Sequence, residues 1–295
     1  RIGFPDPDVK VIGTLVRWHL LLAQTATTRD LDDPATIAMV TDSISTREEL
    51  DLLTALTQAD AKATGDKAWT NWRANLISEL ARRAHQQLEV GELPARVPEP
   101  VVIPKAVLSD PTKVIVDLRA VADGSQMRVI SGERLGLLAD IAGMLGLAKI
   151  SIRTARAWPQ TVDGMPVAVS EWHTDAHAFD AAELRQRLEA VAQRRVQADD
   201  RLRRSEPAGL EPFAMLHPRA SEHATVLEVR ATDRPGLVYQ ICAALAGVQV
   251  SVTSAHLDTV GPQAVDFFYL QDKDRAPLSS GHAQQAVEAV LVALS

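Results

Sequence analysis

Apolar residues recur every three or four positions between residues 8 and 90, which predicts a run of amphipathic helices. The first of these helices places Val16 and His19 on one apolar face. Further along, Ser45 or Thr46 precedes two glutamates, an order that is typical of the capped start of a helix. The pattern therefore predicts an all-helical domain at this end of the chain.

The sequence pattern changes after Gly91. Five prolines follow by Pro111, and proline cannot continue a helix because it has no backbone N–H to donate. From residue 113 onward, "TKVIVDLRAV" and "SQMRVIS" have the alternation and β-branched content of strands. Asp123-Gly124 between them predicts a hairpin turn.

The second part of the chain contains an internal repeat. Residues 127–157 align with residues 227–257 without a gap, at a constant offset of 100. Eight pairs are identical where chance would give about two. The first-copy members of these pairs are Val129, Arg134, Gly136, Leu137, Ile141, Leu145, Ser151 and Ala155.

Each copy predicts the order strand, helix, strand, strand, helix, which belongs to the ferredoxin-like class. The predicted helices cover 135–147, a segment after Asp180, 235–246 and 282–294, and the predicted strands cover 149–158, 166–173, 225–231, 248–258 and 264–271. The second copy ends on a helix, so its final strand is either missing or supplied by another element. The fold class is α+β. Its parts are a helical domain (1–90), a linker (91–112), a first unit (113–195), a linker (196–222) and a second unit (223–295).

The sequence Asp233-Arg234-Pro235-Gly236 joins a predicted strand to the helix that Leu237 opens. Proline suits the first turn of a helix, and an aspartate just before it can cap the free amides. Glycine lets another group approach the backbone closely. Open amides favour a carboxylate and a nearby acid favours an ammonium group, so the turn is a candidate amino-acid site. The alternative is a capped turn that binds nothing.

The first copy carries Glu133-Arg134-Leu135-Gly136 at the same place, with leucine instead of proline. Glu133 can still accept an ammonium group, and the glycine is retained. The segment "ATDRPGLVYQICAALAGVQVSVTSAHLDTVGPQAVDFFYLQD" resembles an ACT domain, a small regulatory module that binds amino acids. The resemblance implies two ferredoxin-like ACT units of βαββα(β) order that pair within the chain or in a homodimer.

Two polar residues stand out in the helical part. His19 follows an apolar helix face, and Asp60 follows Leu53 and Leu56 on another, so both are expected to point inward. A buried carboxylate is costly without a partner, so an ion or a strong donor is expected near Asp60. The alternatives are a hydrogen-bonded core histidine and a helix-end aspartate.

A second resemblance bears on these residues. "LVRWHLLLAQTATTRDLDDP" and "LDLLTALTQADAKATGDKAWTNWRANL" are similar to the later half of the HD domain of the bifunctional enzymes that attach and remove uridylyl groups on the PII signal protein. Members of that family have a nucleotidyltransferase domain, an HD phosphohydrolase domain and two ACT domains. The resemblance implies L-glutamine as the effector and PII as the partner. It also implies a role in nitrogen assimilation, and a divalent metal, Mg²⁺ or Mn²⁺, whose ligands His19 and Asp60 match.

No His-Asp dipeptide occurs in the 295 residues, so the metal dyad of that family and its transferase domain would precede Arg1. The chain alone is therefore expected to be catalytically silent. Uridylyl and adenylyl transfer both stay open. Two other functions also stay open, a stand-alone ACT module and a (p)ppGpp enzyme with HD and ACT units.

The net charge, the apolar runs and the cysteine count bear on the partners and the location of the protein. A net charge of -7 argues against a broad nucleic-acid surface, and the apolar runs are too short and interrupted for a membrane span. The single cysteine, Cys242, excludes an internal disulfide and predicts a cytoplasmic location. Cys242 is expected in the core of the second unit. His173, Asp175 and His177 are a weaker metal candidate, and exposed polar residues are the simpler interpretation.

Overall fold

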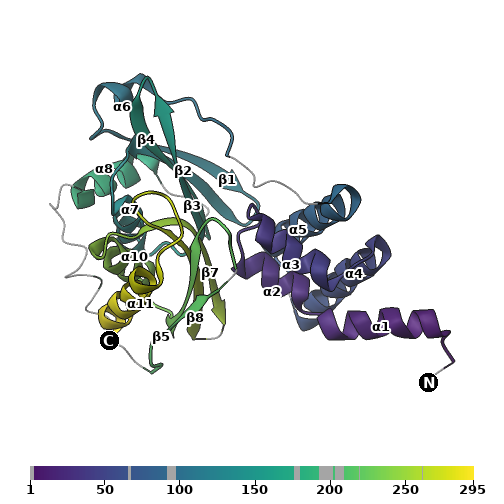
Figure 1. Ribbon diagram of the computed structural model, residues 1–295. Coiled ribbons are helices and arrows are strands. Elements are labelled where there is room, and N and C mark those ends of the chain that lie inside the picture. The colour runs from purple at the N-terminus through teal and green to yellow at the C-terminus, as the bar shows by residue number, and fades with distance from the viewer. Residues whose placement is uncertain are drawn as a thin grey trace. The chain divides into compact units, whose positions relative to one another are not determined.

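A computed structural model of the chain describes residues 3–65, 68–91, 98–175, 180–192, 202, 209–218, 220–260 and 262–295. The chain divides into two compact units, Arg1–Val97 and Pro98–Ser295 (Figure 1). The first unit is helical and the second is built on a single sheet, so the predicted α+β class is confirmed.

The helices of the first unit are α1 (Asp6–Trp18), α2 (Leu21–Thr28), α3 (Pro34–Ser43), α4 (Arg47–Thr64) and α5 (Asn71–Val90). Asp33, Thr46 and Thr70 cap α3, α4 and α5, because each side chain accepts a hydrogen bond from a backbone N–H of the first turn. The predicted helix start at Thr46 is confirmed. The core of this unit is fully buried at Leu22, Ile37, Val40, Ile44, Leu50, Leu53 and Leu80.

Helix α1 contributes no buried residue to this core. Ile12 and Val16, which share its apolar face, expose 41% and 66% of their surface. The prediction that this face points inward is therefore wrong for Ile12 and Val16, whereas Leu15 of the same face is partly buried and packs against the core. Periodicity identifies the residues that share a face, but it does not decide whether another element covers that face.

The second unit is an eight-stranded antiparallel sheet in the order β1-β2-β4-β3-β7-β8-β6-β5. Its strands are β1 (Val114–Val121), β2 (Gly124–Gly132), β3 (Ile152–Val162), β4 (Met165–Thr174), β5 (Phe213–His217), β6 (Thr225–Thr232), β7 (Ser251–Val260) and β8 (Gln263–Gln271). We call β1–β4 with their helices the first half, and β5–β8 with theirs the second half.

The two halves join through β3 and β7, where Ala155 pairs with Ala255. These residues are one repeat offset of 100 apart, so a pseudo-twofold axis passes between them. Pairing within the chain, one of the two arrangements expected for tandem units, is what the structure adopts.

The outer strand of each half precedes the repeat. β1 pairs with β2, and β5 pairs with β6. The segment 213–217, which the sequence places in a linker, therefore forms the edge strand of the second half. The final strand that seemed to be missing at the C-terminus is supplied from the N-terminal side of each repeat.

The remaining helices are α6 (Lys105–Ser109), α7 (Leu137–Leu147), α8 (Ala181–Ala192), α10 (Leu237–Gly247) and α11 (Ser280–Leu294). Helices α7, α8, α10 and α11 share one apolar core with the sheet, and α7 packs against α10 (Figure 1). Helix α6, inside the segment 91–112 expected as a linker, packs on β2 through a separate cluster that includes Val107 and Ile130. Among the helices that the structure describes, none has the length and apolar character needed to cross a bilayer.

Candidate functional site

The two strand-to-helix turns have the same backbone geometry. The Leu137 N–H lies 3.4 Å from the Arg134 carbonyl oxygen, and the Leu237 N–H lies 3.2 Å from the Arg234 carbonyl oxygen. The glycine between them is left-handed, with φ of 83° at Gly136 and 86° at Gly236. This is the signature of a type II turn, which requires glycine at its third position and favours proline at its second.

Two details of the predicted turn are therefore wrong. Pro235 lies in the turn before α10, since the helix begins at Leu237. Asp233 does not cap the helix; its Oδ2 accepts a hydrogen bond from the Thr259 hydroxyl at 3.1 Å. The left-handed Gly236 takes the N-cap position, where it has no side chain to offer, so no side chain caps α10.

The arginine of each turn folds back onto its own helix. Arg234 Nη2 donates to Gln240 Oε1 at 2.7 Å, and Arg134 makes the equivalent contact with the Asp140 carboxylate. Partial burial lowers the pKa of Arg234 from its ordinary value. Both arginines therefore brace the turns.

Each turn lies against the end of the other half's helix. A Cβ added at Gly136 would lie 3.8 Å from Ala246 Cβ in α10, and one added at Gly146 in α7 would lie 3.2 Å from Gly236 Cα. Because residues 146 and 246 are also one offset apart, the pseudo-twofold axis generates two equivalent corners. Each corner is a turn of one half facing the helix end of the other.

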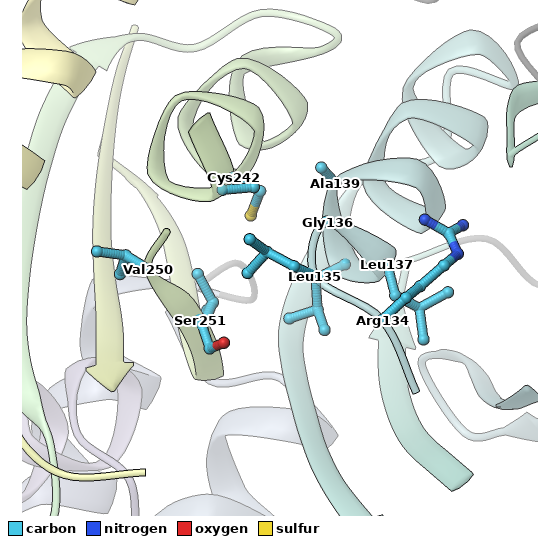
Figure 2. A pocket seen from close by; sticks show the side chains of 11 residues that line it. Arg134, Leu135, Gly136, Leu137, Ala139, Cys242, Val250 and Ser251 are labelled. Atoms are coloured by element: carbon cyan, nitrogen blue, oxygen red, sulfur yellow. The ribbon is translucent and has the colours of Figure 1, made fainter. Parts of the chain in front are cut away.

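The corner at Gly136 is open. A cavity of about 60 Å³ lies there, lined by 134–139 from the first half and by Cys242, Ala246 and 250–252 from the second. This volume is well above the about 10–15 Å³ that a single water molecule needs, and the cavity is open on one side. Figure 2 shows Cys242 and Ser251 on one side and the turn on the other, with the Arg134 guanidinium pointing away from Cys242.

The corner at Gly236 is closed by Leu202. A Cβ added at Gly236 would lie 2.7 Å from Leu202 Cβ, and Leu202 exposes only 5% of its surface. The same leucine reaches Gly146, where an added Cβ would lie 3.5 Å from Leu202 Cδ1. The turn with the stronger motif, Asp233 to Leu237, therefore faces a filled corner.

Glu133, expected to accept an ammonium group, already has a cationic partner. Arg275 Nη2 lies 3.0 Å and 3.3 Å from the two carboxylate oxygens of Glu133. Arg275 follows β8 in the second half, so this ion pair bridges the two halves beside the open corner.

Cys242 lines the open corner from α10 and is buried, as predicted. Burial, with a smaller contribution from the charge of Asp266, raises the pKa of its thiol to about 12. Asp266 itself is buried below α10, and burial, followed by the charges of Asp233 and Asp258, raises its pKa well above the ordinary value.

Residues 225–278 match the family model of the ACT domain. The ACT domain thus begins with β6 and contains the Asp233–Leu237 turn, α10, β7 and β8. The sequence resemblance of the second half is confirmed by this match.

The chain as a whole is similar to proteins named "Bifunctional uridylyltransferase/uridylyl-removing enzyme". The one from Streptomyces coelicolor is 33% identical and aligns with 96% of this chain and 40% of its own length. Those from Gluconobacter oxydans and Mycobacterium tuberculosis are 29% and 30% identical, over 92% and 91% of this chain. The chain spans about 35–40% of the length of these curated relatives. The resemblance to this enzyme family is confirmed.

The two predicted metal ligands of the helical unit are His19 and Asp60. Asp60 is exposed on α4, and half-buried His19 lies just past α1 with Nδ1 2.8 Å from the Val16 carbonyl oxygen. The expectation that both point inward is wrong. Within the described residues, no group of three or more His, Cys, Asp or Glu side chains could hold a metal ion. The assignment of His19 and Asp60 as metal ligands therefore stays a prediction.

The "RDLDDP" motif of the HD resemblance has a structural explanation. Asp30 Oδ1 accepts from the Asp32 N–H at 2.9 Å, and Asp33 caps α3 with Pro34 at its start. Buried Arg83 in α5 donates to the Leu31 carbonyl and, at 2.9 Å, to Asp32 Oδ1. The motif therefore fixes a loop against α5.

His177, the third residue of the motif that His173 and Asp175 belong to, lies outside the described residues. His173 is on β4, and burial lowers its pKa, partly offset by the charge of Asp123.

Three lining residues and one neighbour of the open corner owe their position to tertiary contacts. Ala246, Ser251 and Val252 line it, and Arg275 pairs with Glu133, because the β3–β7 pairing and the packing of α7 on α10 bring the halves together. Overlaying the repeat predicts the two turns, but it does not predict that each turn faces the other half.

Proposed function

We propose that this chain is a regulatory C-terminal portion of a PII-modifying enzyme and that its open corner binds a small amino acid, with L-glutamine as the effector. The observation that carries the proposal is the cavity between the two halves, at an uncapped helix start beside a carboxylate. The ACT match to the second half, and the length over which the bifunctional relatives align, support it.

The geometry suits a zwitterion. Leu138 and Ala139 are the second and third residues of α7, they line the cavity, and no side chain caps the helix. Free amides and the positive helix end stabilise a carboxylate. Glu133 directly precedes Arg134 of the lining and carries a charge that suits the ammonium group, and Val252 offers an apolar wall for the methylene groups. The proposed ligand class is an L-amino acid.

The domain assignment follows from the same proposal. Residues 1–90 correspond to the later part of an HD domain, and residues 91–112 to a connection. The first half, predicted at 113–195, is an ACT domain, and the second is extended at its start to include β5. In the longer enzyme, ligand binding at the ACT interface would bias nucleotidyl transfer to PII and its hydrolytic removal, an allosteric coupling between distinct sites.

Isothermal titration with L-glutamine tests the binding proposal. Ser251 lines the open corner, and Ser151 is its counterpart in the repeat. We expect Ser251→Phe to fill the cavity and abolish binding, and Ser151→Phe to leave binding unchanged. Equal loss in both variants, or no heat for the unaltered chain at millimolar ligand, contradicts the proposal.

We also propose that the chain alone does not hydrolyse uridylyl-PII, because it contains no His-Asp dipeptide. Turnover of uridylyl-PII by the purified chain with added Mn²⁺ would refute this. A cytoplasmic location is proposed from the free, buried thiol of Cys242.

A further inference from the structure

The ion pair between Glu133 and Arg275 joins the two halves next to the turn of the open corner. Glu133 directly precedes Arg134, which lines the cavity. Arg275 comes four residues after Gln271, the strand partner of Ser251, which lines the cavity from the other half. The pair is thus a charged contact between the halves beside the cavity.

Arg275 is held in place by an unusual turn. Its φ is 61°, a left-handed conformation that is uncommon for a residue with a side chain. The Asp272 carboxylate accepts hydrogen bonds from the N–H groups of Asp274 and Ala276 at 2.9 Å and 3.0 Å. The Asp272 N–H also donates to the Ala276 carbonyl at 2.9 Å. Such conformations persist where the surroundings fix them, and they concentrate at ligand clamps and switches.

The closed corner is arranged differently. Asp233, the counterpart of Glu133, accepts a hydrogen bond from the Thr259 hydroxyl of its own half. Among the described residues, the ion pair between the halves therefore lies beside the open corner.

We propose that the Glu133–Arg275 pair is a latch that an amino-acid ligand opens. This inference rests on the proposed function of the cavity. Both side chains are partly exposed, at 36% and 56%, and exposed ion pairs are weak. The ligand ammonium group replaces the Arg275 guanidinium on Glu133, so the acid keeps a cationic partner throughout. Arg275 is released, and the halves lose their charged contact when the ligand binds.

The latch predicts that Arg275 competes with the ligand. In titrations with L-glutamine, Arg275→Gln is expected to bind about two- to five-fold more tightly than the unaltered chain. Glu133→Gln is expected to bind at least about ten-fold more weakly, because a charge-assisted contact is lost. The double variant should match Glu133→Gln. Lys273→Gln, which removes a positive charge from the same turn but pairs with Asp274, should leave affinity unchanged.

A ligand without an ammonium group separates competition from a general charge effect. Glutaramic acid, the deaminated counterpart of L-glutamine, should gain nothing from Arg275→Gln. Unchanged or weaker L-glutamine binding by Arg275→Gln overturns the latch while leaving the proposed function intact. Absence of binding by both the unaltered chain and Arg275→Gln overturns the latch together with the proposed function.

Discussion

Leu202 packs directly on Gly236, and a Cβ added at the glycine would lie 2.7 Å from Leu202 Cβ. A Cβ added at Gly136, the counterpart of Gly236, would meet among the described residues only Ala246 Cβ, at 3.8 Å. The repeat alone would make the two corners equivalent, and the Leu202 side chain makes them unequal. The consequence is that, among the described residues, the turn at Gly136 faces a cavity whereas the turn at Gly236 faces Leu202.

Replacing Leu202 should open the second corner. Leu202→Ala is expected to raise the number of L-glutamine molecules bound per chain from one to two, because the Gly236 turn then faces free space. Removing a buried leucine side chain should also lower the free energy of unfolding by about 2 kcal/mol. Titration calorimetry and urea unfolding measure the two effects. Leu210→Ala, at an exposed leucine, is the control; unchanged stoichiometry in Leu202→Ala would refute the explanation.

Alanine should be tolerated unequally at the two turn glycines. Gly136→Ala should cost about 1 kcal/mol of folding free energy, because only the left-handed backbone opposes it. Gly236→Ala should cost clearly more, because its methyl group also collides with Leu202. A double-mutant cycle isolates this collision: in the Leu202→Ala background, the excess cost of Gly236→Ala should disappear. Equal costs in both backgrounds would mean that Leu202 does not constrain Gly236.

The sequence predicted most of the sheet because the repeat is local and strongly patterned. The helix at 235–246 and the strands at 225–231 and 264–271 lie within a few residues of α10, β6 and β8. Strand β5 was missed because its five residues have little pattern of their own and gain their partners only from β6.

The sequence also predicted the part of the candidate site that has a local pattern. Both turns need glycine because the backbone is left-handed at that position, so Gly136 and Gly236 could be found from the sequence. Leu202 and Arg275 could not, because their importance comes from contacts with residues 34 and 142 positions away. Asp60 was misplaced because helical spacing does not specify which faces are covered.

Alkaline pH should destabilise the ACT core through Cys242. Its thiol pKa is about 12 in the folded chain, compared with 9.0 for the free group. Because the folded pKa is raised, this stabilising contribution is complete below pH 9 and is lost as the pH rises toward 12. Between pH 8 and pH 10, the free energy of unfolding should therefore fall by about 1.4 kcal/mol more than it does in Cys242→Ala.

Urea unfolding at the two pH values measures this difference. Alanine is a suitable replacement because Ala142, the counterpart of Cys242, is buried in α7. Parallel losses in both proteins would show that the thiol does not contribute.

Arg83 should be the most sensitive charged residue of the helical unit. Its side chain is 6% exposed, and it holds both the Leu31 carbonyl and the Asp32 carboxylate. Arg83→Met should lower the free energy of unfolding by about 3 kcal/mol, because the loop loses its donor and a partly buried acid loses its cation. Arg82→Met is the matched control: Arg82 is 59% exposed and pairs with Glu79, so its loss should cost about 0.5 kcal/mol or less.

Hydrogen exchange locates the effect of Arg83→Met within the chain. Amides of α2 and α3 should exchange faster in this variant, because these helices flank the loop that Arg83 holds, while those of the sheet should be unchanged. The same losses of stability in Arg82→Met and Arg83→Met, or faster exchange confined to the sheet, would show that the "RDLDDP" loop does not depend on this contact. The motif would then require an explanation other than folding.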